Sequence, residues 1–534
     1  MSLFGSLYVG ASGLQTSQNA LNTTAHNMSN VDTTGYTRQQ ILFGTRSYNT
    51  LSVSASAVSY QQYGLGVYYS QVRQVRDVFL DQTYRKESGR GSFYDKNTQV
   101  IEEMEDLFGE FQGVEFSKAL DNLWTSIQEL SKDPCKLTNQ GLFVSRAEEF
   151  IDRAALVYKG LSDQQDNLNK QVKNNVEKIN AYGETLVNIN KQIMKLEAGD
   201  IEHANDLRDK RNQIIDELSK MGEITYDEDM YGVVTMKFEG VDFVKSDSVN
   251  KLKLYEDKET GFYTPYWAQL ATYKKGADGQ PELDLESCRL YDPTQKISAD
   301  LNTDIGSMRA ILLARGEKRA TYHDMEDADS YNENIAQSLL MNIQAEFDQM
   351  VNKIVTVIND VLRQAAESEP DTDYMKDENG DPYQLFEVVS NDPDVGFTIG
   401  NIVLNDDLKR EPARLSFRLK DGNEDETTMK KLVDALSEES YSLNPNLQTK
   451  TSLVKYYSNL VIQISNTGEA NREIAEYQAN TINETFSARE QVVGVSSDEE
   501  MEFMIKFQNA YNASSRYINV INEMMEHILN TLGR

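Results

Sequence analysis

Apolar side chains recur every seventh residue at both ends of the chain and predict two long helices with narrow apolar stripes. The N-terminal stripe consists of Phe4, Leu7, Ala11, Leu14, Leu21 and Met28. The C-terminal stripe consists of Met504, Phe507, Tyr511, Ile518, Ile521, Met525, Ile528 and Leu532. An interval of seven is the repeat of a coiled coil. We therefore expect the terminal helices to pack on each other and on neighbouring copies of the chain.

The N-terminal helix lacks the charged face of an ordinary surface helix. From Met1 to Thr37 the only formally charged side chain is Asp32, whereas a solvated helix normally carries a polar, charged face. Gly5, Gly10 and Gly13 each weaken a helix by about 1 kcal/mol relative to alanine. This helix is therefore expected to need contacts on several sides and to fold on assembly.

The middle of the chain alternates between helical and strand patterns. Apolar residues at steps of three and four predict long packed helices over residues 168–196, 331–364 and 451–490. Alternating residues interrupted by Gly and Asp predict strands between residues 223 and 300, and an irregular region spans 367–420. The fold class is therefore mainly α with β inserts, with the terminal helices forming a coiled coil.

These patterns predict five parts. They are an assembly domain of residues 1–45 and 495–534, a linker or hairpin of residues 46–76, a helical rod domain of residues 77–222, 321–366 and 446–494, a β-rich outer insert of residues 223–320, and a smaller irregular insert of residues 367–445.

The segment after the first helix carries a motif. Residues 25–39 read AHNMSNVDTTGYTRQ, which resembles the N-terminal signature of bacterial flagellar axial proteins, the family of rod, hook and hook-associated proteins. Asp32 and Thr34 depart from its usual form. Turn-forming Asn30 and Asp32 and the conformational freedom of Gly35 predict the end of the helix here. The resemblance also implies that Gly35 and Tyr36 belong to the assembly interface.

Three further segments resemble the hook-associated members of this family. They are residues 64–82, the run NDLRDKRNQIIDELS at residues 205–219, and residues 494–513, which include GVSSDEE and FQNAYNA. Without the resemblance, the alternating charges of the second segment would indicate a solvated, salt-bridged helix face. In the third segment, Ser497 is the expected N-cap of the last helix and Glu500 completes a capping box.

The resemblance implies a structural protein at the junction between flagellar hook and filament, with no catalysis and no cofactor. Its implied partners are further copies of this chain, the flagellar hook protein, the next junction protein (hook-associated protein 3) and an export chaperone at the C-terminal region. It also implies an extracellular location, reached through type III export without a cleaved signal peptide.

Composition agrees with this interpretation and narrows the alternatives. The 534 residues carry a formal charge of −32, which disfavours nucleic acid as a partner. No apolar run is long enough to cross a membrane, and no secretory signal pattern opens the chain. Cys135 and Cys288 are too few and too far apart for a disulfide framework or a zinc site.

The sequence offers little for catalysis or metal binding. The four histidines are dispersed and form no metal-binding motif. An acidic loop at residues 371–381 could suggest Ca²⁺, but Pro382 breaks the EF-hand order. Two alternatives stay open: a hook or distal rod subunit, and a surface adhesin or enzyme with its activity in a β insert.

Overall fold

The computed structural model describes residues 3–52, 61–108, 116–199, 203–275, 281–368, 374–377, 380–390, 392, 395–419 and 421–532. The chain divides into two compact units. The terminal unit contains residues 1–89, 178–251 and 478–534, and the central unit contains residues 90–177 and 252–477. In the acidic loop considered for Ca²⁺, Asp371, Asp373, Glu378 and Asn379 lie outside the described residues.

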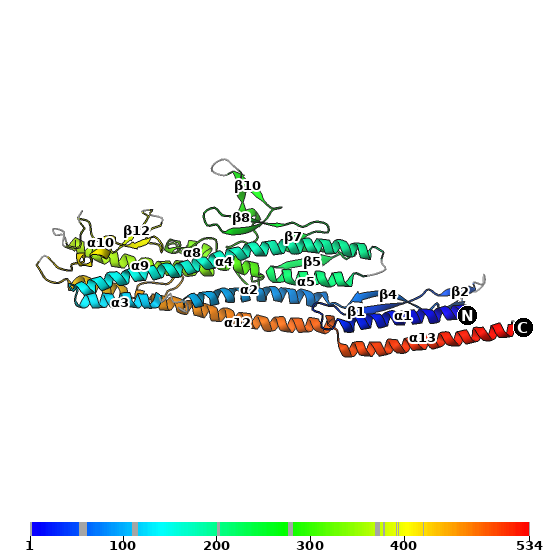
Figure 1. Cartoon of the computed structure of the whole chain (residues 1–534). Coiled ribbons are helices and arrows are strands. Elements are labelled where there is room, and N and C mark those ends of the chain that lie inside the picture. Colours follow the sequence, from blue (N-terminus) through cyan, green and yellow to red (C-terminus); the bar gives the residue numbers. More distant parts are fainter. Residues whose placement is uncertain are drawn as a thin grey trace. The chain divides into compact units, whose positions relative to one another are not determined.

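Long helices make up most of the structure, as the sequence pattern predicts (Figure 1). The helices are α1 (Leu3–Ser29), α2 (Val78–Phe108), α3 (Phe116–Lys132), α4 (Leu137–Glu197), α5 (Asn205–Met221), α6 (Leu285–Cys288), α7 (Ser307–Arg315), η1 (Tyr322–Met325), α8 (Ala328–Asn334), α9 (Leu339–Ser368), α10 (Asp406–Arg410), η2 (Pro412–Arg414), α11 (Glu426–Ser437), α12 (Leu453–Val493) and α13 (Ser497–Leu532). None of the described helices is both long and apolar enough to span a bilayer.

The strands form small antiparallel sheets. They are β1 (Gln39–Thr45), β2 (Asn49–Ser52), β3 (Gln61–Tyr63), β4 (Val67–Gln74), β5 (Ile224–Glu228), β6 (Val234–Phe238), β7 (Val241–Val244), β8 (Leu252–Glu256), β9 (Tyr263–Trp267), β10 (Thr272–Lys275), β11 (Pro281–Asp284), β12 (Phe386–Val388) and β13 (Ile402–Leu404). β5, β6 and β7 form a three-stranded meander, and the other strands pair as β1–β4, β2–β3, β8–β9, β10–β11 and β12–β13. The prediction of a mainly α fold with β inserts is confirmed.

The terminal unit brings the two ends of the chain together. α1 and α13 lie side by side (Figure 1), and they run antiparallel, because Gly10 lies against Ile518 while Gly13 lies against Ser514. The β1–β4 hairpin packs along α1. Its register pairs Gln39 with Gln74, with a bulge after Leu42 that bends the hairpin.

The central unit has a large apolar core. Its aromatic side chains Phe108, Phe116, Phe150 and Phe347 are at most 3% exposed. The rings of Phe116 and Phe347 meet edge to face with centroids 5.0 Å apart, a favoured aromatic geometry. α9 and α11 pack on each other beside this cluster. This unit therefore has a hydrophobic core of its own.

Two details differ from the sequence prediction. Steps of four and three along residues 168–196 would put Asn175 and Tyr182 on the buried stripe of α4, but the buried positions are Val176 and Gly183. Gly183 leaves room there for the ring of Phe243 on β7. Ser497 is the first helical residue of α13 and not its N-cap. The N-cap is Ser496, whose carbonyl accepts from the N–H of Glu500 at 3.0 Å.

Candidate assembly site

Small residues set the contact between α1 and α13. A Cβ atom added at Gly10 would lie 2.8 Å from Ile518 Cγ1, and one added at Gly13 would lie 2.8 Å from Ser514 Oγ. No real side chain fits at such distances, so these glycines allow the two helices to approach closely. Their cost in helix propensity is thereby offset by packing.

Hydroxyl groups explain why α1 can be polar without being charged. Thr16 Oγ1 donates to the carbonyl of Ser12 at 2.7 Å, and Ser17 Oγ donates to the carbonyl of Gly13 at 2.8 Å. Each hydroxyl thus satisfies its hydrogen bond within its own helix and can be buried at little cost. Ser12 Oγ also lies 3.3 Å from the N–H of Val67 on β4, to which it can act as an acceptor.

The predicted interface residues lie mainly at the border of this contact. Those that are half-buried are Leu7, Leu14, Leu21, Met28, Tyr36, Met504, Phe507, Tyr511, Ile518 and Met525, whereas Phe4, Ala11, Gly35 and Ile528 are exposed. Ile521 is buried at 5% exposure. The side chain of Leu532 lies outside the described part of the chain. Within one copy, α1 buries instead its small residues, among them Ser6, Gly10, Ser17 and Ala20.

The signature segment after α1 folds around Asn27, which is 1% exposed. Its side-chain amide donates to the carbonyl of Gln39 at 2.8 Å, and its oxygen accepts from the N–H of Gln39 at 3.0 Å and from the hydroxyl of Tyr36 at 2.8 Å. Burial beside Asp209 raises the pKa of Tyr36. This hydroxyl therefore stays protonated and remains a donor at neutral pH.

Gly35 adopts a φ of 77°, as its position in the turn predicts. A side chain there would collide with Gln213 of α5, whose amide donates to the carbonyl of Thr34 at 2.8 Å. The signature turn therefore docks directly on the charged run of residues 205–219, and the two segments that resemble the flagellar family contact each other.

Arg38 connects the N-terminal signature to the start of α13. The guanidinium of Arg38 lies 2.9 Å from the carboxylates of both Glu499 and Glu500. The backbone N–H of Arg38 donates to the carbonyl of Val493 at 2.9 Å. The side chain of Glu500 is only 3% exposed, so this ion pair is shielded from solvent and salt. Glu500 therefore pairs with Arg38 instead of completing the predicted capping box.

The charged run on α5 is partly buried, so the interpretation as a solvated face is wrong for its central residues. Asp209 and Arg211 are 7% and 2% exposed. Asp216 pairs with Arg85 at 2.6 Å and with Arg489 at 2.9 Å. These pairs join α2, α5 and α12 within the terminal unit. Sequence periodicity missed this network, because its partners are far apart along the chain.

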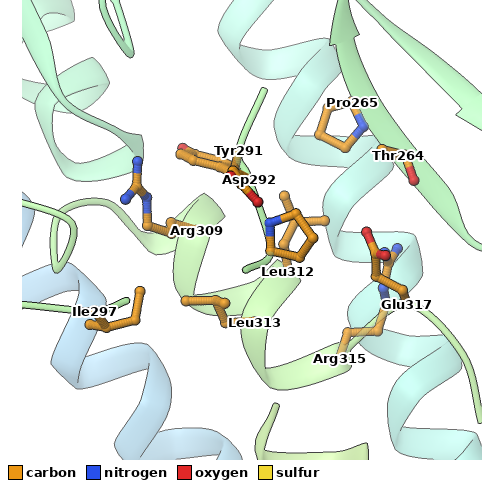
Figure 2. A pocket seen from close by; sticks show the side chains of 11 residues that line it. Thr264, Pro265, Tyr291, Asp292, Ile297, Arg309, Leu312, Leu313, Arg315 and Glu317 are labelled. Atoms are coloured by element: carbon orange, nitrogen blue, oxygen red, sulfur yellow. The ribbon is translucent and has the colours of Figure 1, made fainter. Parts of the chain in front are cut away.

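The central unit contains a small pocket beside β9 and α7 (Figure 2). Its volume is about 40 Å³, enough for one or two water molecules. The Arg309 guanidinium lies 4.6 Å from the centre of the Tyr291 ring, and the other walls are mainly apolar. Among the residues that the structure describes, no three His, Cys, Asp or Glu side chains converge as metal ligands.

Comparisons with known families agree with this geometry. The family described as Flagella basal body rod protein matches residues 7–37, and the family described as Flagellar basal body rod FlgEFG protein C-terminal matches residues 491–531. These ranges cover α1 with its signature turn and almost all of α13. They define an axial protein of the bacterial flagellum.

The family described as Flagellar hook-associated protein FlgK helical domain matches residues 101–374, just over half of the chain. The chain belongs to this family of hook-associated proteins. It is a structural component of the flagellum and not an enzyme.

Relatives match along the whole chain. Flagellar hook-associated protein 1 of Bacillus subtilis is 25% identical over 100% of this chain and 99% of its own length. The proteins of that name from Salmonella typhimurium and Escherichia coli are 23% and 22% identical, each over 97% of this chain and 98% of their own. A solved structure of the flagellar hook junction protein FlgK from Burkholderia pseudomallei matches 57% of this chain and 46% of its own, with 16% identity and a TM-score of 0.40.

Proposed function

We propose that copies of this chain assemble through their terminal helices into the junction between flagellar hook and filament. The observation that carries this proposal is the exposure of α13. Among its described side chains, residues 497–531, only Glu500 and Ile521 are buried. A long helix with so little coverage gains most of its stability from contacts outside its own chain.

The exposed side of α13 carries its own apolar stripe. Val520, Met524 and Ile528 follow one another at steps of four and are 45%, 50% and 39% exposed. On α1, Phe4 is 76% exposed. Contiguous apolar side chains of this kind mark a protein–protein interface. The predicted interface residues Ile518, Ile521 and Met525 lie next to this stripe, so one copy can cover another.

A junction needs two different faces, one fitted to the hook protein and one to the next junction protein. Copies related by head-to-tail contacts form a ring or short helical turn that presents such faces. We place the terminal helices at the inner wall and the β inserts on the outside. Before assembly, the apolar stripe of α13 is a surface that an export chaperone can cover. We place the assembled protein outside the cell.

Electron microscopy of cells that lack this chain tests the proposal. We expect bare hooks, with unassembled filament protein in the medium. Loss of the hooks as well would assign the chain to the hook or the distal rod instead. Intact flagella would contradict the proposal and direct attention to an adhesive or enzymatic role of the β inserts.

Substitutions in the terminal helices test the interface separately. Leu14→Lys and Ile521→Lys should leave the central unit folded and abolish incorporation into flagella, because each places a charge in an apolar seam. Leu156→Lys, at a position 48% exposed on α4, is the matched control and should remain motile. Normal motility of both seam variants would contradict the interface.

A further inference from the structure

A larger pocket lies within the terminal unit, and arginines dominate its wall. Its volume is about 300 Å³, and elements β4, α2, α5 and β5 contribute to it. Its charged lining consists of Arg73, Arg76, Arg85, Arg208, Arg211, Asp81 and Glu228, with His203 beside them. The chain as a whole has 53 basic and 85 acidic residues. This wall therefore has the opposite charge balance to the rest of the protein.

The innermost arginines are almost inaccessible to solvent. The side chains of Arg85 and Arg211 are 3% and 2% exposed, and a buried guanidinium is costly unless its donors are paired. Arg211 donates to the carbonyl of Gly232 at 2.5 Å and to Glu228 at 2.9 Å. Its Nε–H has no partner within the described part of the chain, so one buried donor remains available.

The two carboxylates of the wall are already engaged. Asp81 accepts two hydrogen bonds from Arg76, at 2.9 and 2.7 Å, and also pairs with Arg489 at 2.9 Å. Glu228 accepts from both Arg208 and Arg211. Behind the wall, Glu197 and Asp216 also pair with arginines, whereas Asp209 accepts from Gln74 and from the N–H of Thr37.

Arg73 is the exposed arginine of this pocket. Its guanidinium donates to the amide oxygen of Gln40 at 3.1 Å, and no described carboxylate pairs with it. Arg73, which is exposed, and Arg211, which is buried, both line this pocket. Positive charge in the lining, with its carboxylates already paired, favours a bound anion.

We propose that this pocket binds an oxyanion, a phosphate or carboxylate group, held by the guanidinium groups of Arg73 and Arg211. Planar guanidinium donors match the oxygens of both groups. A water molecule occupies about 30 Å³, so the pocket has room for such a group and several waters. The anion is either a small free molecule or an acidic side chain of a neighbouring copy. Of these two sources, only the acidic side chain of a neighbouring copy rests on the proposed function.

Titration calorimetry of the purified full chain with inorganic phosphate and with citrate, at constant ionic strength, tests the site directly. We expect saturable binding that Arg73→Gln weakens about tenfold, the value of one charge-assisted hydrogen bond. Lys210→Gln is the matched control. Lys210 is exposed on α5 next to Arg211, loses the same charge and does not line the pocket. The Lys210→Gln variant should bind phosphate and citrate with the same affinity as the unaltered chain.

Cells that carry Arg73→Glu distinguish the two sources. Loss of motility, with Lys210→Glu cells still motile, assigns the anion to a carboxylate of a neighbouring copy. Normal motility combined with phosphate or citrate binding in vitro assigns it to a small free anion. The proposal is overturned if the chain binds neither anion and Arg73→Glu cells swim normally, or if Arg73→Gln and Lys210→Gln weaken binding equally. Failure of the junction assignment would appear separately, as intact flagella in cells lacking the chain.

Discussion

The helices α9 and α13 are both long and carry apolar stripes, yet they bury very different fractions of their side chains. α9 buries 19 of its 30 residues within its own unit. In α13, only two of the described side chains at residues 497–531 are buried. The same periodic pattern therefore serves two purposes. In α9 it builds a core within one chain, whereas in α13 it provides a surface for other chains.

The two helices also differ in how they hold their buried carboxylates. α9 buries two carboxylates, Glu346 at 0% and Asp348 at 1% exposure. Glu346 accepts hydrogen bonds from the amides of Asn342, Asn444 and Gln463, and no described cation pairs with it. α13 holds its buried carboxylate, Glu500, against Arg38. A full core tolerates a buried acid between amides, whereas the sparsely covered helix uses a paired ion.

The largest predicted effect concerns the core of α9. Phe347→Ala removes a side chain that is fully buried against Phe108 and Phe116. We expect a loss of about 3–5 kcal/mol in the free energy of unfolding of the central unit. Urea denaturation of the isolated chain measures it. A loss below about 1 kcal/mol would show that this core is not packed as described.

The second prediction uses pH. Burial raises the pKa of Glu346 to about 7 from its ordinary value of 4.5. Its stabilising contribution is therefore complete below pH 4.5 and is lost as the pH rises to 7, by roughly 3 kcal/mol in total. Urea denaturation from pH 4 to pH 8 should show stability falling over this range.

A variant separates Glu346 from its neighbour Asp348. Burial raises the pKa of Asp348 to about 6, so that group also loses its contribution as pH rises, but mostly below pH 6. Glu346→Gln should therefore flatten the fall between pH 6 and pH 7 in particular. An unchanged slope there would contradict the assignment of this fall to Glu346.

The third prediction concerns the close contact of α1 and α13. Gly10→Val places methyl groups against Ile518 and Tyr517 and should cost about 1–3 kcal/mol in packing. We expect the terminal helices to become more sensitive to limited proteolysis and incorporation into flagella to fall. Gly141→Ala is the control, because a Cβ there meets nothing within 4 Å. It should stabilise α4 by up to about 1 kcal/mol.

The smallest effect on the isolated chain is expected on the exposed stripe of α13. Met524→Ala should change the free energy of unfolding by less than about 0.5 kcal/mol, because Met524 is 50% exposed. Its incorporation into flagella should nevertheless fall, since assembly would bury that side chain. Glu523→Ala, at the adjacent exposed position, serves as the comparison. Equal incorporation of the two variants into flagella would show that Met524 does not belong to the interface.

Local patterns along the chain predicted five of the long helices, α1, α4, α9, α12 and α13. Steps of three and four located α4, α9 and α12, and the turn residues after Met28 located the end of α1 and the positive φ of Gly35. The cap of α13 was predicted one residue late, because Ser496 and Ser497 offer equal hydroxyls in the sequence and only the hydrogen bonds of the folded helix distinguish them. These features depend on neighbours within a few residues.

The sequence by itself determined the fold class, the helical segments and the family signatures, because periodicity, turn chemistry and motifs are local properties. The tertiary structure alone decided which residues meet. It pairs Arg38 with Glu500, 462 positions apart, and it buries Asp209 and Arg211 in a run that looks solvated. It also covers the small face of α1 and leaves Met524 exposed. Burial and charge pairing depend on distance in space, which a one-dimensional pattern does not contain.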